Sequence, residues 1–347
     1  MMKIGILTFY NCDNYGALLQ AYSLAFYIRN QGYEVRFLEH ELNREVPMRR
    51  KQGLLAWLKS KLVDILIRTE KERRNKSFSL FVEHNFPKEK YNSSFDKIII
   101  GSDQVWNMNL THNDLYYLGT EFNCEVSSYA ASCGKFSSMS TDQKHLIVDN
   151  LQKFRNISVR EQQTAKLLQT KLKQVVSSVL DPTLLVENSV FSQIEQQVNI
   201  KGKFVLVYDC MDKATYLFAK NIARQLNAKV IALSCCVRAR THCKSFQAAS
   251  VEEFLWLFSH AECVVTTSFH GCAISLSYNK DFYAINFNKE TTSRIKELLE
   301  SVGLMSRYVK VTDSDIVYES IEYTQVNGKL SVLREKSVSY LNKVLKS

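Results

Sequence analysis

Short apolar runs alternate with amphipathic stretches along most of the chain. The runs are rich in valine and isoleucine and end at glycine, asparagine, aspartate or proline, which is typical of buried strands. The stretches between them carry apolar residues every three or four positions, which predicts helices packed on a sheet. We expect strands at residues 3–8, 34–38, 97–100, 125–129, 157–160, 175–179, 204–208, 229–233, 263–267 and 282–286.

The helical pattern falls between these strands. We expect helices at residues 16–30, 141–154, 161–171, 214–226, 251–260, 272–278 and 292–302. Strands that alternate with helices form parallel sheets covered by helices on both faces. The alternation lapses over 186–201, a polar and glutamine-rich stretch, and then restarts. The pattern predicts an α/β protein of two Rossmann-like domains, 1–186 and 187–347, which face a central cleft.

Composition narrows the class of protein. Of 347 residues, 46% are hydrophobic and 23% charged, which is ordinary globular usage and excludes wholesale disorder. No apolar run reaches the roughly 18 residues that a membrane span needs. The first residues lack the long apolar core of a signal peptide. We therefore expect a cytoplasmic protein with reduced cysteines.

Basic residues concentrate in one segment, residues 53–76, of a chain whose formal charge is +10. Leucines and Trp57 recur there at helical spacing. Such a helix suits contact with an anionic inner leaflet, and it equally suits a sheet-covering helix with a solvated basic face. No recognisable nucleic-acid motif accompanies the charge, so we expect no nucleic acid. A non-catalytic basic protein that binds nucleic acid or membrane is the alternative from a different class.

Two groups of residues raise the question of a metal site. Cys235, Cys236, His242 and Cys243 lie close together, but they lack paired Cys-x-x-Cys spacing, and adjacent strand residues point to opposite faces. Asp313-Ser314-Asp315 resembles the D-x-D of metal-dependent glycosyltransferases, although helix capping is the simpler explanation. We expect no metal.

Polar side chains follow two strands of the first predicted domain. Asn14, Tyr15 and Gly16 open the first helix, whose free amides favour an anion or a sugar hydroxyl, unless Asn14 is only a helix cap. The segment lacks the glycine spacings of dinucleotide-binding and P-loop proteins. The third strand is followed by donors, acceptors and one aromatic ring, the combination that a sugar needs: Ser102, Asp103, Gln104, Trp106 and Asn107. A capped turn with Trp106 in the core is the structural alternative.

Two further residues follow strands in positions suited to chemistry. Arg160 ends the strand 157–160, where its forked guanidinium suits phosphate or carboxylate, or else pairs with Glu161. His270 follows the strand 263–267, and an imidazole there could act as general acid or base near neutral pH. A single histidine is more often structural than catalytic, so position alone leaves its role open.

Several motifs occur in one order along the chain. They are Asn14-Tyr15-Gly16-Ala17, GSDQVWN at 101–107, SYAAS at 128–132, SVRE at 158–161, Asp181-Pro182-Thr183, SFHG at 268–271 and Ser293-Arg294-Ile295. As a set they resemble the polysaccharide pyruvyl transferase family over most of the chain. The resemblance implies a GT-B-like fold and transfer of pyruvate from phosphoenolpyruvate to two sugar hydroxyls as a ketal, in exopolysaccharide or capsule synthesis. It implies no cofactor, with a sugar or lipid-linked oligosaccharide as acceptor.

The resemblance also assigns roles to residues. His270 becomes the general acid and Asp103 the acceptor-side base, with the donor held by Arg160, Ser268, Gly271 and Arg294. The acceptor would contact Asn14, Tyr15, Gly16, Ser102, Gln104, Trp106 and Asn107. Better-known members have an arginine where this chain has Ser268, and Arg160, Arg238, Arg294 and Arg307 are the candidates to replace it. A glycosyltransferase that uses a nucleotide sugar, with Glu290 or Glu297 on the ribose, is the alternative enzyme.

Overall fold

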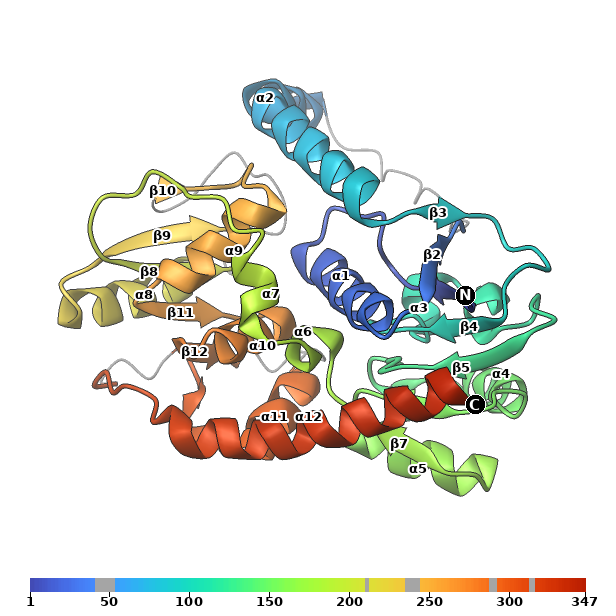
Figure 1. Cartoon of the computed structure of the whole chain (residues 1–347). Coiled ribbons are helices and arrows are strands. Elements are labelled where there is room, and N and C mark those ends of the chain that lie inside the picture. The colour runs from blue at the N-terminus through green and yellow to red at the C-terminus, as the bar shows by residue number, and fades with distance from the viewer. Residues whose placement is uncertain (41–53, 210–211, 235–243, 287–291, 312–315) are drawn as a thin grey trace.

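Two parallel sheets organise the chain (Figure 1). The computed structural model describes residues 1–40, 54–209, 212–234, 244–286, 292–311 and 316–347, with side chains in the helix 54–85 described from residue 67 onward. The N-terminal sheet has the order β3-β2-β1-β4-β5, and the C-terminal sheet has the order β10-β9-β8-β11-β12-β13. The expected α/β class with two Rossmann-like domains is confirmed.

The strands lie close to their expected positions. In the N-terminal sheet they are β1 (Lys3–Leu7), β2 (Glu34–Leu38), β3 (Lys88–Glu89), β4 (Lys97–Ile100) and β5 (Glu125–Ser128). A two-stranded sheet of β6 (Ile157–Val159) and β7 (Val176–Ser178) adjoins β5 through the isolated bridge Ser127↔Asn156. The C-terminal strands are β8 (Phe204–Tyr208), β9 (Lys229–Leu233), β10 (Lys244–Ser245), β11 (Cys263–Thr266), β12 (Asp281–Ile285) and β13 (Tyr308–Val309).

Helices cover both sheets. They are α1 (Tyr15–Asn30), α2 (Leu54–Asn85), α3 (Met108–Thr111), α4 (Thr141–Leu151), α5 (Gln162–Leu172), α6 (Pro182–Leu185), α7 (Asn188–Ser192), α8 (Lys213–Gln225), α9 (Val251–His260), α10 (Phe269–Ser277), α11 (Thr292–Val302) and α12 (Tyr323–Lys346). Short 3₁₀ turns are η1 (Leu115–Leu118), η2 (Phe136–Ser138) and η3 (Met305–Arg307). Side-chain caps mark several helix starts, such as Asn14 at α1 and the capping box of Ser250 and Glu253 at α9.

The last helix ties the two domains together. In Figure 1, α12 runs beneath the C-terminal sheet and on to the N-terminal one. Near its middle, Ser337 accepts the backbone amide of Leu180 through its Oγ, and the Tyr340 hydroxyl donates to the backbone oxygen of Ser128. The final turn accepts a hydrogen bond from Lys97 through the backbone oxygen of Val344. The sequence pattern did not predict this return to the N-terminal domain.

A buried arginine joins the domains on the opposite side. Arg74 of α2 is 2% exposed, and its guanidinium donates to the Tyr15 hydroxyl and to the backbone oxygens of Ser234 and Gln247, at 2.8, 3.2 and 3.0 Å. Its charge also lies over the Tyr15 ring, 4.6 Å from the centroid. The Tyr15 hydroxyl in turn donates to the backbone oxygen of Ala249. These bonds link α1 and α2 to the C-terminal domain through buried, directional contacts.

Replacing this arginine should destabilise the protein. Arg74→Ala leaves buried acceptors without a donor, so the free energy of unfolding should fall by about 3 kcal/mol. The neighbouring Arg73 is the matched control, because its side chain is 69% exposed and pairs with Glu253 at the surface. Arg73→Ala should change stability by no more than about 0.5 kcal/mol. Urea unfolding of the full chain measures both, and equal effects would contradict the interdomain role of Arg74.

Candidate functional site

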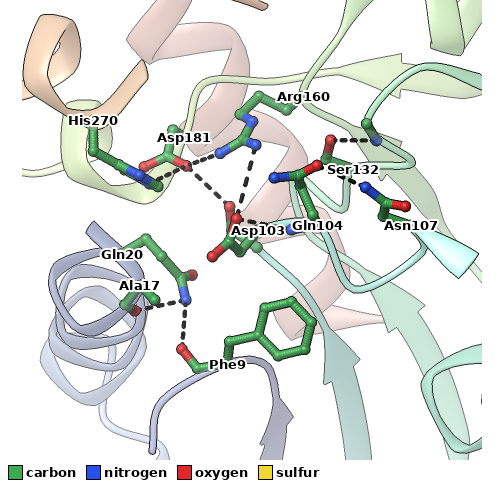
Figure 2. A network of polar contacts seen from close by, with 12 residues as sticks. Phe9, Ala17, Gln20, Asp103, Gln104, Asn107, Ser132, Arg160, Asp181 and His270 are labelled. Atoms are coloured by element: carbon green, nitrogen blue, oxygen red, sulfur yellow. Dashed lines mark hydrogen bonds and ion pairs between the residues drawn. The ribbon is translucent and has the colours of Figure 1, made fainter. Parts of the chain in front are cut away.

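The carboxyl ends of both sheets face each other, and α6 lies between them. Asp181 precedes α6 as its N-cap, between α1 of the first domain and α10 of the second, both of which pack on α6. Loops that follow β4 and β6 bring Asp103 and Arg160 to the same place, and the start of α10 brings His270 (Figure 2). Because carboxyl ends of parallel strands meet at one edge, residues far apart in sequence converge there.

The carboxylate of Asp181 lies at the centre of these contacts and is 1% exposed. Its Oδ2 accepts from Arg160 Nη1 at 2.9 Å and from the Ser102 hydroxyl at 3.1 Å. Its Oδ1 accepts from the amide and hydroxyl of Thr183, at 3.0 and 2.7 Å. Burial acts to raise the pKa of Asp181, but His270, Arg160 and the Thr183 amide together hold that pKa well below its usual range. The residue is therefore a buried, ionised carboxylate.

His270 lies on the other side of Asp181. Its Nε2 is 3.6 Å from Asp181 Oδ2, and this nitrogen is buried without a hydrogen-bond partner. Ser268 caps α10 by accepting the Gly271 amide. The opposite wall is Gly16, where an added Cβ would come within 2.2 Å of His270 Nδ1, so only glycine lets α1 approach the imidazole. His270, in the first turn of α10, thus lies against the start of α1.

Two arginines lie side by side in this site. Arg160 is buried, with its guanidinium over the Phe269 ring at 4.3 Å, and its Nη2 lacks a hydrogen-bond partner. Arg294 is 8% exposed and has no hydrogen bond or ion pair within the described residues. Burial and the charge of Arg160 lower the pKa of Arg294 to about 10. Within the described residues, Arg160 Nη2 and the Arg294 guanidinium are therefore donors without a hydrogen-bond acceptor.

The loop after β4 supplies Asp103 and its neighbours. Asp103 has a left-handed backbone, φ 69°, which its hydrogen bond from the Ser132 amide holds in place. Its Oδ1 accepts the Gln104 amide at 2.8 Å and lies 4.0 Å from Arg160 Nη2. Gln104 and Asn107 are half-buried and joined by a side-chain hydrogen bond of 2.9 Å. These residues form one rim of the site in Figure 2.

Unpartnered buried polar atoms gather here. Within the described part of the chain, four such atoms belong to this region: Gln20 Oε1, Arg160 Nη2, Glu161 Oε2 and His270 Nε2. Buried polar atoms are nearly always hydrogen-bonded, so a cluster of exceptions indicates a place where a polar ligand supplies the partners. Both donors and acceptors are open, which suits a ligand that carries an anionic group and hydroxyls.

A cavity of about 470 Å³ adjoins the two arginines. Its lining includes Arg160, Arg294, Phe269 and Asp181, together with residues of α5, α11 and α12. Glu297 of α11 lines this cavity and accepts the backbone amide of Gln162 at 2.8 Å. The size fits a small anionic metabolite with room beside it.

Two aromatic residues predicted to bind the acceptor instead lie in the core. Trp106 has no exposed surface, donates its indole N–H to the backbone oxygen of Tyr117, and stacks with Phe154. Tyr15 also has no exposed surface and stacks on Phe254 at 4.4 Å. We correct both assignments, because a ring without exposed surface offers no face to a sugar.

The remaining predicted residues divide between the site and local structure. Asn14 is exposed and caps α1, which is the structural alternative given for it above. Ser268 likewise caps α10. Ser102 is fully buried, and its hydroxyl donates a hydrogen bond to Asp181. Gly271 packs its Cα against Thr266, where an added Cβ would meet Oγ1 at 2.3 Å. Asp103, Arg160, His270 and Arg294 converge as expected, and these contacts leave their individual roles as predictions.

Three residues of the site were not predicted from the sequence. Asp181 was named only as part of the family motif Asp181-Pro182-Thr183 and was given no role, although an aspartate followed by proline is typical of a helix start. Gln20 is fully buried inside α1, where its amide donates to Thr8 Oγ1. Glu161, expected only as a possible partner of Arg160, does lie 3.5 Å from Arg160 Nε, but it is buried and also accepts the Ser132 hydroxyl at 2.6 Å. A glutamine or glutamate in a helical pattern ordinarily indicates an exposed side chain. The periodicity therefore gave no sign that Gln20 and Glu161 are buried.

The other residues that the sequence suggested for metal or donor binding do not contribute to this site in the part of the chain that the structure describes. Among the described residues there is no cluster of three or more metal-ligating side chains. Cys235, Cys236, His242, Cys243, Asp313, Asp315, Arg238 and Glu290 lie outside the described residues. Arg307 is occupied elsewhere, since it donates to the backbone oxygen of Glu319 and lies over the Tyr283 ring. No helix in the described ranges is long and apolar enough to cross a bilayer.

A protein-family model matches most of the chain. The family model for polysaccharide pyruvyl transferase matches residues 14–288, well over half of the chain. No curated protein matches the sequence.

Solved structures resemble the chain at low identity. UDP-GlcNAc 2-epimerase from Methanocaldococcus jannaschii is 12% identical, with 99% of each chain covered and a TM-score of 0.48. UGT2 from Phytolacca americana is 10% identical, with 100% of this chain and 99% of that chain covered and a TM-score of 0.49. UDP-GlcNAc 2-epimerase from Neisseria meningitidis is 10% identical, with 100% of both covered and a TM-score of 0.47.

The ionised Asp181 should make stability depend on acid pH. Its folded pKa lies below the unfolded value of about 3.9, so its contribution is full above that value and is lost as pH falls through the folded pKa. Asp181→Asn should lower the free energy of unfolding by about 3 kcal/mol at pH 7 and flatten its decline below about pH 4. Urea unfolding between pH 3 and pH 7 measures both.

A matched control separates this effect from general acid sensitivity. Asp149 on α4 is exposed, so Asp149→Asn should leave the pH profile of stability close to that of the wild type. An Asp181→Asn profile parallel to the wild-type profile would contradict a buried carboxylate that stays ionised.

Proposed function

The chain belongs to the polysaccharide pyruvyl transferase family, and on this basis we propose that it transfers pyruvate from phosphoenolpyruvate to a sugar. In the proposed reaction C3 of the donor gains a proton, a sugar hydroxyl attacks C2, and the C2–O bond to phosphate breaks. A second hydroxyl then closes the ketal. Of the two hydroxyl protons released, one balances the proton gained by C3 and the other leaves on phosphate.

The unused guanidinium groups are the observation that supports this donor most strongly. Phosphoenolpyruvate carries a carboxylate and a phosphate, and Arg160 Nη2 and the Arg294 guanidinium are donors with no hydrogen-bond partner in the described chain. Arg294 accounts for the charge that the family's arginine supplies where this chain has Ser268. The cavity of about 470 Å³ beside both arginines has room for such an anion.

His270 is the group we assign to proton transfer. Its Nε2 has no hydrogen-bond partner and lies 3.6 Å from Asp181 Oδ2, in the first turn of α10, where an imidazole can donate or accept a proton. Asp181 is thus a positioning residue that acts through His270 and Arg160. The amides at the start of α10 add partial positive charge for the departing phosphate.

Asp103 is assigned to the acceptor side. Its Oδ1 is held by the Gln104 amide, and Oδ2 accepts no hydrogen bond from the described residues. This oxygen is free to accept the proton of an attacking sugar hydroxyl. The neighbouring amides of Gln104 and Asn107 suit further hydroxyls of the same sugar. No metal or redox cofactor enters these steps.

A test of the reaction is phosphate release from phosphoenolpyruvate with a panel of galactosides and N-acetylmannosaminides. We expect acceptor-dependent release and a gain in sugar mass that matches a ketal. His270→Ala should abolish turnover while calorimetry still detects phosphoenolpyruvate binding. Arg294→Ala should raise the KM for phosphoenolpyruvate at least tenfold, since one charged hydrogen bond is lost.

The same experiment distinguishes the proposed pyruvyl transfer from the reaction of a glycosyltransferase. Thermal stabilisation by a nucleotide sugar, without phosphate release, would favour a glycosyltransferase and contradict the proposed donor. An active His270→Ala variant would overturn the assignment of the acid. Gln225→Ala, at the exposed end of α8, serves as a control that should leave turnover unchanged.

We further propose that α2 contacts an anionic membrane surface, so that the acceptor is a lipid-linked oligosaccharide. In Figure 1 this helix extends beyond both sheets, and the side chains of Arg68 and Arg73 are 76% and 69% exposed. Exposed basic side chains on a projecting helix favour an anionic leaflet. The chain should co-sediment with phosphatidylglycerol vesicles, and less at high salt. Equal binding to phosphatidylcholine vesicles would contradict an electrostatic contact.

A further inference from the structure

The helix α5 begins with backbone amides that its N-cap side chain leaves unpaired. This N-cap, Glu161, makes no side-chain capping hydrogen bond, and the helical ladder starts where the amide of Ala165 donates to the backbone oxygen of Glu161. Amides of the first turn have no partner within a helix. The carboxylate of Glu297, on α11 of the C-terminal domain, accepts the Gln162 amide at 2.8 Å. Glu297 therefore caps α5 from the opposite domain.

This interdomain cap lies beside both arginines of the site. Gln162 comes two residues after Arg160, and Glu297 comes three residues after Arg294, on the same face of α11. All four residues line the cavity of about 470 Å³. The Glu297–Gln162 hydrogen bond thus joins the segment that carries one guanidinium group to the helix that carries the other.

The two guanidinium groups do not hold each other in place. Burial and the charge of Arg160 lower the pKa of Arg294 to about 10, because the two cations repel each other. The helix α11 packs on α10, α12 and η3 of its own domain, and these contacts alone do not fix its distance from α5. Burial raises the pKa of the Glu297 carboxyl, whereas the amides of Gln162 and Gln163 stabilise its ionised form. The hydrogen bond from α5 to Glu297 opposes the separation that repulsion between the arginines favours.

We propose that Glu297 is a positioning residue that holds Arg294 beside Arg160, so that the two guanidinium groups form one site for the donor anion. Arg160 Nη2 and the Arg294 guanidinium have no hydrogen-bond acceptor in the described chain, which leaves both available to such a ligand. Groups that are held in place before a ligand arrives lose less freedom when it binds. The inference rests on the proposed function for the identity of the anion. It also gives Glu297 a role other than the ribose contact expected in a glycosyltransferase.

Donor kinetics with matched variants test this role. Glu297→Ala should raise the KM for phosphoenolpyruvate about tenfold and leave kcat within about twofold, because the arginines bind the donor in the ground state and the transition state alike. Glu297→Gln keeps an acceptor oxygen for the Gln162 amide, so its KM should stay within about threefold of the wild-type value. Glu300→Ala is the control, because Glu300 also lines the cavity from α11 but pairs with Lys296, and its side chain is 51% exposed. Its KM should not change.

A double variant distinguishes a positioning role from direct contact with the donor. If Glu297 acts through Arg294, then Glu297→Ala should raise the KM no further in a protein that already carries Arg294→Ala. Calorimetry with phosphoenolpyruvate and with inorganic phosphate should show the same order of affinities among the variants, and it needs no turnover. Additive effects of the two substitutions, or a wild-type KM in Glu297→Ala, would overturn the positioning role.

Amide hydrogen exchange tests the interdomain cap itself, independently of the reaction. Exchange of the Gln162 amide should be at least about tenfold faster in Glu297→Ala than in the wild type, because an amide at this position has no partner within the helix. Unchanged exchange would overturn the cap, and binding of neither anion to the wild type would overturn the anion site. Anion binding that depends on Glu297, without pyruvyl transfer, would instead contradict the proposed function and leave the positioning role standing.

Discussion

An ionised carboxylate buried where the two domains meet constrains the rest of this structure. Transfer of a charge from water into a protein interior costs several kcal/mol unless its oxygens are fully paired. The four hydrogen bonds to Asp181 come from Ser102 after β4, Arg160 after β6 and Thr183 in α6. Those three segments therefore have fixed positions relative to one another. His270 of α10 faces the same oxygen, so the requirement extends across the domain boundary.

The pairing of Asp181 is complete, whereas that of the surrounding cations is not. Arg160 donates a hydrogen bond to Asp181 through Nη1, whereas its Nη2 has no hydrogen-bond partner. Arg294 has no hydrogen bond or ion pair in the described chain. Two buried guanidinium groups repel each other, which agrees with the lowered pKa of Arg294. Phe269 offers one of them an aromatic face, but that contact supplies no acceptor. An anionic ligand would supply the acceptor that these guanidinium groups lack, which links the electrostatics of the site to the proposed donor.

Sequence periodicity predicted the two sheets and the convergence of Asp103, Arg160 and His270, because both follow from strand order and the rule that carboxyl ends share an edge. It could not predict what covers a given side chain. Trp106 and Tyr15 stand in polar turns, yet partners far along the chain enclose them, Phe154 for one and Phe254 for the other. The role of Asp181 depends on Ser102, which lies 79 residues away. The long α12 carries an ordinary helical pattern, and nothing local indicates that it returns to the first domain.

The position of Asp181 also joins the two sides of the proposed reaction. Its Oδ2 lies 2.9 Å from Arg160 Nη1 and 3.6 Å from His270 Nε2, and Arg160 Nη2 lies 4.0 Å from Asp103 Oδ1. A donor anion that accepts a hydrogen bond from Arg160 Nη2 would therefore bind a guanidinium that already contacts a carboxylate on each side. Because the same guanidinium is placed by Asp181, which also faces His270, donor binding would hold the proposed acid and the proposed base in fixed positions around one group.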